Sequence, residues 1–146
     1  MTEISAAMGL TNLAKIDKVL EVNKCNYQAY KAKLESFPEV KLLSYDESEA
    51  NNFQYIVVEL MRGNAETRDQ IIEALHAENI RARKYFWPGC HNMKPYRELY
   101  PHANLLLPNT EIVSDRIIVL PTGTSVSEDA IETIANVLGL LVKDIG

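Results

Sequence analysis

The chain lacks three features that would place it in a specialised class of protein. Its two cysteines, Cys25 and Cys90, are too few for a disulfide framework. Its 15 basic and 20 acidic residues give a net charge of -5, so no basic field is available to hold a nucleic-acid backbone. No apolar run approaches the roughly 20 residues that cross a bilayer. We therefore expect neither a nucleic-acid partner nor a membrane segment.

Length and composition fit one folded unit. A chain of 146 residues with 47% hydrophobic content can bury a core, so we expect a single domain or one unit of something longer. The opening Met1-Thr2-Glu3 lacks the basic and apolar regions of a signal peptide. Together with the low cysteine content, this predicts a cytoplasmic setting.

Hydrophobic spacing predicts an α+β (α/β) fold, a small sheet with helices packed on one of its faces. An amphipathic pattern over residues 5–36 indicates one long N-terminal helix, or two helices joined near Asn23. Strands are predicted over 40–45, 53–61, 80–86 and 117–120. Further helical segments are predicted over 65–78, 96–100 and 109–114 and after residue 127, with Thr2, Asn64 and Ser127 as N-caps.

The start of the first helix has an unusual surface. Residues 4–10 are small and apolar nearly all round, whereas the first helix of a free-standing domain normally turns a polar side to water. We expect something to cover this segment.

The loop at residues 83–97 concentrates aromatic, basic and imidazole side chains around a Pro-Gly break. Tyr85 and His91 are candidate ligand contacts, because a phenol and an imidazole can each donate and accept hydrogen bonds. Strand alternation places Arg83 on the side of Tyr85, where it could neutralise a diphosphate, and leaves Lys84 simply exposed. A surface loop anchored by one buried aromatic is an equally open interpretation.

No complete catalytic set is readable. Cys90, His91 and His102 lack the spacing of a zinc site, so no metal is predicted. Residues 121–125 precede a helix but lack the phosphate-loop pattern, and an ordinary strand-to-helix turn explains them better.

Three separated motifs resemble one known family. They are the opening residues 1–10, the loop pattern Tyr-x-x-x-x-x-His-x-x-x-Pro-Tyr from Tyr85 to Tyr96, and Leu107-Pro108-Asn109-Thr110-Glu111 followed by Leu120-Pro121 and Ser127-Glu128-Asp129. Over essentially its whole length the chain is similar to the C-terminal part of DegT/DnrJ/StrS-type aminotransferases. These are pyridoxal-phosphate enzymes that act on nucleotide-linked keto sugars in deoxysugar pathways, including those of lipopolysaccharide O-antigens.

The resemblance implies that residues 1–146 form a single domain, the small, mostly antiparallel C-terminal domain of the aspartate-aminotransferase-like fold. The Schiff-base lysine would lie in a large N-terminal domain that this chain lacks, so we assign no catalytic residue here. That large domain would cover the apolar first helix, and the parent enzyme would be a homodimer. The isolated chain is not expected to transaminate.

The same resemblance implies where substrate binds. By position, Tyr85 and His91 match the family's contacts to sugar or cofactor, with Arg83, Trp87 and Tyr96 as weaker candidates. Many relatives carry His where Tyr85 stands, so the contact there can differ.

A stand-alone small-molecule binding or regulatory module remains the alternative, because fold alone does not decide function. Such a module would bury the face at residues 4–10 internally or by dimerising. A domain separated from its neighbour would leave it exposed.

Overall fold

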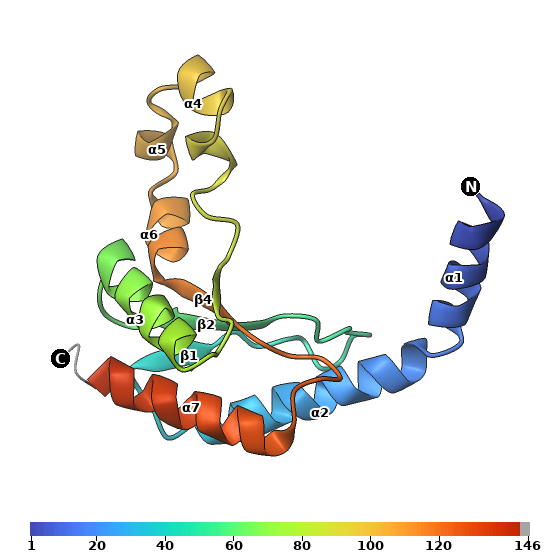
Figure 1. Cartoon of the computed structure of the whole chain (residues 1–146). Coiled ribbons are helices and arrows are strands. Elements are labelled where there is room, and N and C mark those ends of the chain that lie inside the picture. The colour runs from blue at the N-terminus through green and yellow to red at the C-terminus, as the bar shows by residue number, and fades with distance from the viewer. Residues whose placement is uncertain (144–146) are drawn as a thin grey trace.

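The computed structural model describes residues 1–143 (Figure 1). The elements, in chain order, are α1 (Glu3–Leu13), α2 (Ile16–Leu34), β1 (Val40–Leu42), β2 (Ile56–Leu60), α3 (Ala65–Ala77), β3 (Arg83–Lys84), the short 3-10 helix η1 (Cys90–Asn92), α4 (Tyr96–Leu99), α5 (Ala103–Leu106), α6 (Pro108–Arg116), β4 (Ile117–Leu120) and α7 (Glu128–Lys143). Their order agrees with the predicted α+β layout, with short helices inside the predicted loop.

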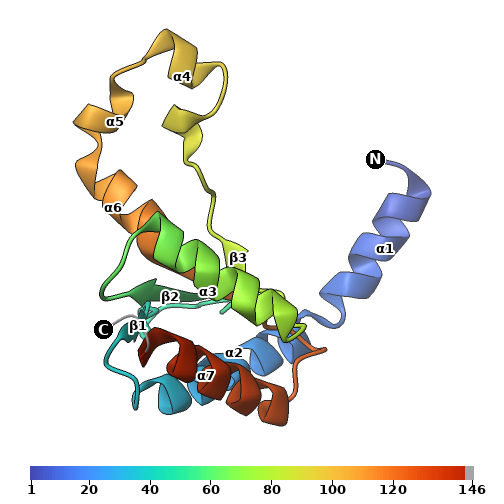
Figure 2. The same ribbon diagram turned by 60° about the vertical axis from the view of Figure 1, so that its left-hand side comes forward.

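A four-stranded antiparallel sheet in the order β1-β2-β4-β3 forms the centre of the molecule. In the β2–β4 pair, Ile56 lies opposite Leu120 and Val58 opposite Ile118. These side chains share one face and join the core with buried residues of α2, α3 and α7. The predicted packing of helices on one face is confirmed, and α2 and α7 lie side by side in both views (Figures 1 and 2).

The N-terminal helical segment divides at Ala14 and Lys15, not near Asn23. Asparagine side chains can compete with helical backbone bonds, which favours a break near Asn23. In the structure these amides bind loops instead. Asn23 Nδ2 donates to the carbonyl of Asn52 at 3.1 Å, and Asn26 Nδ2 donates to that of Gly123 at 3.1 Å.

Helix α1 projects away from the core (Figure 1). Ile4, Met8 and Leu10 are 75%, 62% and 69% exposed, and the apolar stripe becomes fully buried only from Tyr27 onward. The three predicted N-caps are confirmed: the side chains of Thr2, Asn64 and Ser127 accept from backbone amides three residues later.

The third strand is much shorter than predicted, pairing only at Arg83 and Lys84. The preceding residues end α3 instead: Asn79 takes a φ of 59°, and the amide of Ile80 donates to the carbonyl of Leu75 at 2.8 Å. This is a Schellman-type helix end, which consumes the start of the expected strand.

Residues 86–116, here called the arm, extend from the sheet and return to it (Figures 1 and 2). The outgoing limb leaves β3 and passes through η1 to α4, while the returning limb runs through α5 and α6 into β4. The arm therefore joins two neighbouring strands, so its base is fixed by the sheet.

Gly139 lies where α7 packs closely against the ring of Phe37. A Cβ there would lie 2.1 Å from Cε1 of Phe37. Gly to Ala in a helix interior ordinarily stabilises by up to about 1 kcal/mol, but overpacking costs about 1–3 kcal/mol. We expect Gly139→Ala to lower the free energy of unfolding by about 1 kcal/mol in urea denaturation.

The matched control is Gly9→Ala in α1, where a Cβ meets nothing within 4 Å. It should not destabilise the chain. A gain in stability from Gly139→Ala would contradict the close approach of Phe37.

Candidate functional site

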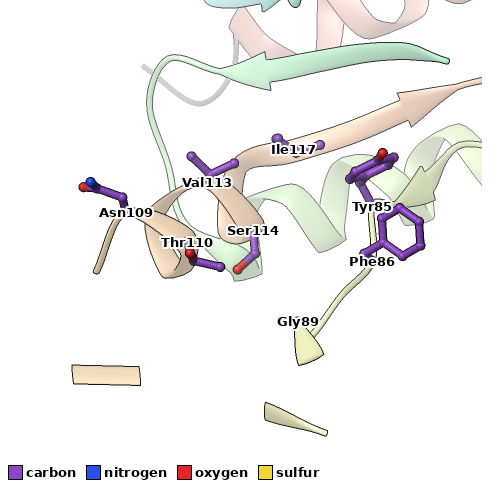
Figure 3. Close-up of a pocket in the computed structure, with 8 residues that line it drawn as sticks. All are labelled: Tyr85, Phe86, Gly89, Asn109, Thr110, Val113, Ser114 and Ile117. Atoms are coloured by element: carbon purple, nitrogen blue, oxygen red, sulfur yellow. The ribbon is translucent and has the colours of Figure 1, made fainter. Parts of the chain in front are cut away.

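Two hollows share the side chains of Tyr85 and Phe86. One, the arm cleft, lies between the limbs of the arm at its base, has a volume of about 370 Å³, and is lined by Tyr85, Phe86, Gly89, Asn109, Thr110, Val113, Ser114 and Ile117 (Figure 3). The other, the sheet hollow, has about 360 Å³ and is lined by Gln54, Tyr55, Arg83, Lys84, Tyr85, Phe86 and Val119. Concave sites with apolar walls and a few polar groups are typical of ligand binding.

The sheet places Arg83 and Tyr85 on the face away from the helices. Arg83 lies opposite Val119, whose side chain alternates with the core residues Ile118 and Leu120. Arg83, Lys84 and Tyr85 all line the sheet hollow, so it is the register with Val119 that places Arg83 on the side of Tyr85.

An aromatic neighbour holds the ring of Tyr85 in place. Its ring meets that of Tyr55 edge to face, with the centroids 5.5 Å apart. The Tyr45 hydroxyl accepts from the Tyr55 amide at 3.2 Å and donates to the Tyr55 carbonyl at 2.8 Å. Tyr45 in turn packs edge to face on buried Tyr27. Tyr85 is therefore connected to the core by an aromatic chain.

Phe86 and Gly89 give the outgoing limb its local shape. Phe86 has a φ of 44°, uncommon for a bulky residue, and its side chain is 70% exposed beside the cleft. Gly89 has a φ of 87°, and a Cβ there would lie 2.7 Å from Cε1 of His91. The His91 ring can approach the backbone this closely only because residue 89 is glycine.

Helix α6 supplies polar groups that the sequence analysis did not assign. Asn109, Thr110 and Ser114 line the arm cleft opposite Tyr85 and Phe86 (Figure 3). The signal was present, because Asn109 and Thr110 lie within the quoted Leu-Pro-Asn-Thr-Glu motif. The contacts predicted from the sequence all lie between Arg83 and Tyr96.

The imidazole of His91 binds within the arm. Its Nε2 bonds to Oε1 of Glu111, and Asn92 Nδ2 donates to the same oxygen at 2.8 Å. The hydrogen bond from His91 lowers the pKa of Glu111; burial opposes this shift, and the bond from Asn92 adds to it. The side chain of His91 is 10% exposed and is not part of the cleft lining, so this pair joins the outgoing limb to α6.

Lys84 also lines the sheet hollow, whereas Trp87 and Tyr96 lie outside both linings. The prediction that Lys84 is simply exposed is wrong. Its Nζ lies 2.6 Å from Oδ2 of Asp69 and 4.4 Å from the centroid of the Trp87 ring. Tyr96 is 52% exposed on α4, away from the sheet (Figure 1). The structure thus groups Arg83 and Lys84 with Tyr85 in the sheet hollow and places Trp87, His91 and Tyr96 outside both linings.

The two hollows offer hydroxyl, amide and guanidinium groups between aromatic walls, a set suited to sugar hydroxyls and to an anion. Across residues 1–143, no three His, Cys, Asp or Glu side chains gather closely enough to hold a metal ion. Among the helices that the structure describes, none is long and apolar enough to cross a membrane.

Comparison with known proteins gives one consistent family. Residues 1–139 match the DegT/DnrJ/EryC1/StrS aminotransferase family. The chain is 31% identical over 138 residues to dTDP-4-amino-4,6-dideoxy-D-glucose transaminase of Escherichia coli, an alignment that covers 94% of this chain and 37% of that protein.

Solved aminotransferase structures are similar to this chain. The crystal structure of DesI in the presence of its TDP-sugar product is similar with a TM-score of 0.87 and 40% identity, over 97% of this chain and 36% of DesI. Helicobacter pylori PseC, an aminotransferase involved in the biosynthesis of pseudoaminic acid, shares the fold with a TM-score of 0.85 at 18% identity, over 99% of this chain and 38% of PseC. The chain spans a little over a third of the length of these relatives.

The His91–Glu111 pair predicts a pH dependence. Because the folded pKa of Glu111 is lowered, its stabilisation is complete above the unfolded pKa of about 4.3 and is lost as the pH falls through the folded value. Glu111→Gln should therefore destabilise the arm by about 1 kcal/mol at pH 7 and reduce its sensitivity to acid below about pH 5. Hydrogen exchange of the Asn92 and Met93 amides measures this locally.

Glu98→Gln is the control on the same arm. Glu98 pairs with Lys94, but both side chains are at least 60% exposed, so little change is expected. Equal acid sensitivity of the native chain and Glu111→Gln would contradict a stabilising His91–Glu111 pair.

Proposed function

We propose that this chain, which belongs to the DegT/DnrJ/EryC1/StrS aminotransferase family, is the C-terminal small domain of a nucleotide-sugar aminotransferase. The family match confirms the resemblance noted in the sequence, and the family depends on pyridoxal phosphate. In this proposal the parent enzyme transfers an amino group to a nucleotide-linked keto-deoxysugar. This chain contributes contacts to the substrate or cofactor and closes over the active site.

The observation that carries the proposal is the position of Tyr85. It lines both hollows, on the sheet face opposite the helices and at the base of the arm. A face that carries aromatic and polar groups is suited to close over a second, cofactor-bearing surface. Fold likeness alone would not support this, because one fold hosts many functions.

The described residues do not fit a complete pyridoxal-phosphate site. When bound, this cofactor supplies an electron sink and is carried as a Schiff base on a lysine. Lys84 is the lysine in the lining of the sheet hollow, and its ammonium is 2.6 Å from Asp69. We therefore assign no catalytic lysine here and propose that the missing large domain provides it.

The chain's own groups have distinct proposed roles. The exposed guanidinium of Arg83 can bind a phosphate oxygen pair, and the Tyr85 hydroxyl can hydrogen-bond the sugar or cofactor. Thr110 and Asn109 add polar groups on the opposite wall of the arm cleft. Contacts to the substrate or cofactor of the parent enzyme stay a prediction for His91, Trp87 and Tyr96. His91 and Trp87 already have partners within this chain.

The exposed face of α1 supports a missing partner surface. Ile4, Met8 and Leu10 are all more than 60% exposed, so the chain does not bury them internally and a second surface would have to cover them. In the proposal the large domain covers this face, and the parent is a homodimer.

A chimera tests the function. Residues 1–139 of this chain would replace the matching segment of the E. coli transaminase. We expect the chimera to show the internal-aldimine absorbance of bound pyridoxal phosphate and to transaminate that enzyme's substrate. This chain alone should give no stoichiometric lysine adduct after borohydride treatment.

Either of two results would refute the proposal. One is a trapped lysine adduct on the chain alone. The other is a folded chimera that binds the cofactor but does not transaminate.

Within the chimera, Tyr85→Phe and Arg83→Gln should each raise KM for the nucleotide sugar about tenfold, the effect of losing one hydrogen bond or ion pair worth roughly 1.4 kcal/mol. Steady-state kinetics measures this. Arg81→Gln is the matched control, because Arg81 is also exposed, lies two residues earlier and is outside both linings. An unchanged KM in both site variants would remove Tyr85 and Arg83 from the substrate contacts.

A further inference from the structure

Arg68 is an unusual residue for its place in the chain. It lies near the N-terminus of α3, where the helix dipole disfavours a cation, and its side chain is 0% exposed. Arginine is almost never fully buried without partners. Its position is therefore explained by what it contacts rather than by helix stability.

One contact is to the returning limb of the arm. Arg68 Nη1 donates to the carbonyl oxygen of Ser114. Ser114 is in the last turn of α6, where backbone carbonyls have no partner further along the helix because the chain passes into β4 at Ile117. The guanidinium thus caps α6 at the end where the dipole favours positive charge.

A second contact is to the outgoing limb. The Arg68 guanidinium carbon lies 5.6 Å from the centroid of the Trp87 ring, within the range of a cation–π contact. Lys84 Nζ lies 4.4 Å from the same centroid. The ring of the outgoing limb is therefore held by two cations at the base of the arm.

Asp69 holds both cations. Its Oδ1 accepts from Arg68 Nε and Nη2 at 2.9 and 2.7 Å, and its Oδ2 lies 2.6 Å from Lys84 Nζ. Burial raises the pKa of Asp69, but the hydrogen bonds from Lys84 and Arg68 outweigh it and leave the pKa below its ordinary value. The carboxylate is thus ionised near neutral pH, and the buried guanidinium is paired.

We propose that Arg68 is the positioning residue of the arm cleft: it joins both limbs of the arm to α3 and so sets the separation of Tyr85 and Phe86 from α6. Its effect on catalysis rests on the proposed function, but its effect on the arm does not. Arg68 is not in the lining of either hollow, so it acts through Trp87 and Ser114. A buried ion pair that served only stability would hold the fold without changing how the cleft binds.

Trp87 is the only tryptophan in the chain, so its fluorescence reports the outgoing limb directly. Arg68→Met keeps the volume and leaves Asp69 paired with Lys84, while Arg68→Lys keeps the charge but not the fork of donors. In the full 146-residue chain, we expect Arg68→Met to leave the far-ultraviolet circular dichroism of the fold in place, to shift Trp87 emission to the red, and to steepen its quenching by acrylamide. Arg68→Lys should give a smaller change, and the exposed control Arg81→Met none.

Kinetics in the chimera separates positioning from stability. Arg68→Met should raise KM for the nucleotide sugar about tenfold and leave kcat within about twofold. The reason is that displacement of one wall of the arm cleft weakens substrate binding in the enzyme that remains folded. Loss of folded enzyme would lower the apparent kcat and leave KM unchanged. Partial recovery of KM in Arg68→Lys would support the geometric role.

The outcomes distinguish the two proposals. Unchanged Trp87 quenching in a folded Arg68→Met chain, or loss of fold in both Arg68 variants, would overturn the positioning role whatever the chimera does. Altered quenching with an inactive parental chimera would leave the positioning of the arm supported and would count against the proposed function.

Discussion

The antiparallel pairing of β2 with β4 is the constraint on which the rest of the molecule depends. Its register sets Ile56 opposite Leu120 and Val58 opposite Ile118, so these side chains all face the helices. A slip of one residue would turn Glu59 toward the core and every core residue of β2 away from it. On its other edge β4 pairs with β3, and there Arg83 lies opposite Val119 on the face away from the helices. Core and candidate site thus lie on opposite faces of a sheet in which β4 pairs with both β2 and β3.

Two sets of contacts hold the candidate site in place. The first is aromatic: buried Tyr27 packs on Tyr45, whose hydroxyl binds the backbone of Tyr55, whose ring meets Tyr85. The second is polar: Arg68 on α3 contacts both limbs of the arm, and Asp69 pairs with Arg68 and with Lys84 in β3. Groups that bind a ligand work best when fixed by packing and by hydrogen bonds behind them, and this chain has both.

The arm changes character along its length. Its base is bound by Arg68, and the His91–Glu111 pair joins its limbs further out. Toward the tip, Leu105 and Leu106 are 74% and 80% exposed. Apolar exposure of this kind, together with the apolar side chains of α1, marks surfaces that contact other proteins or domains. It agrees with the proposal that this chain is a smaller part of a larger enzyme.

Local signals in the sequence determined the longer helices, the three N-caps and the strand 117–120, because caps and apolar periodicity depend on neighbouring residues. The resemblance of three motifs also identified the family. The sequence could not show that Asn23 binds a loop, that Asn79 and Ile80 end a helix, or that Lys84 meets Asp69, since each depends on a partner chosen by the tertiary fold. For the same reason the polar wall of α6 and the place of His91 against Glu111 emerged only when residues about 20 positions apart were brought together. The sequence shows the chemical character of each residue. Which residues pair with one another is decided by the sheet and by the arm that it anchors.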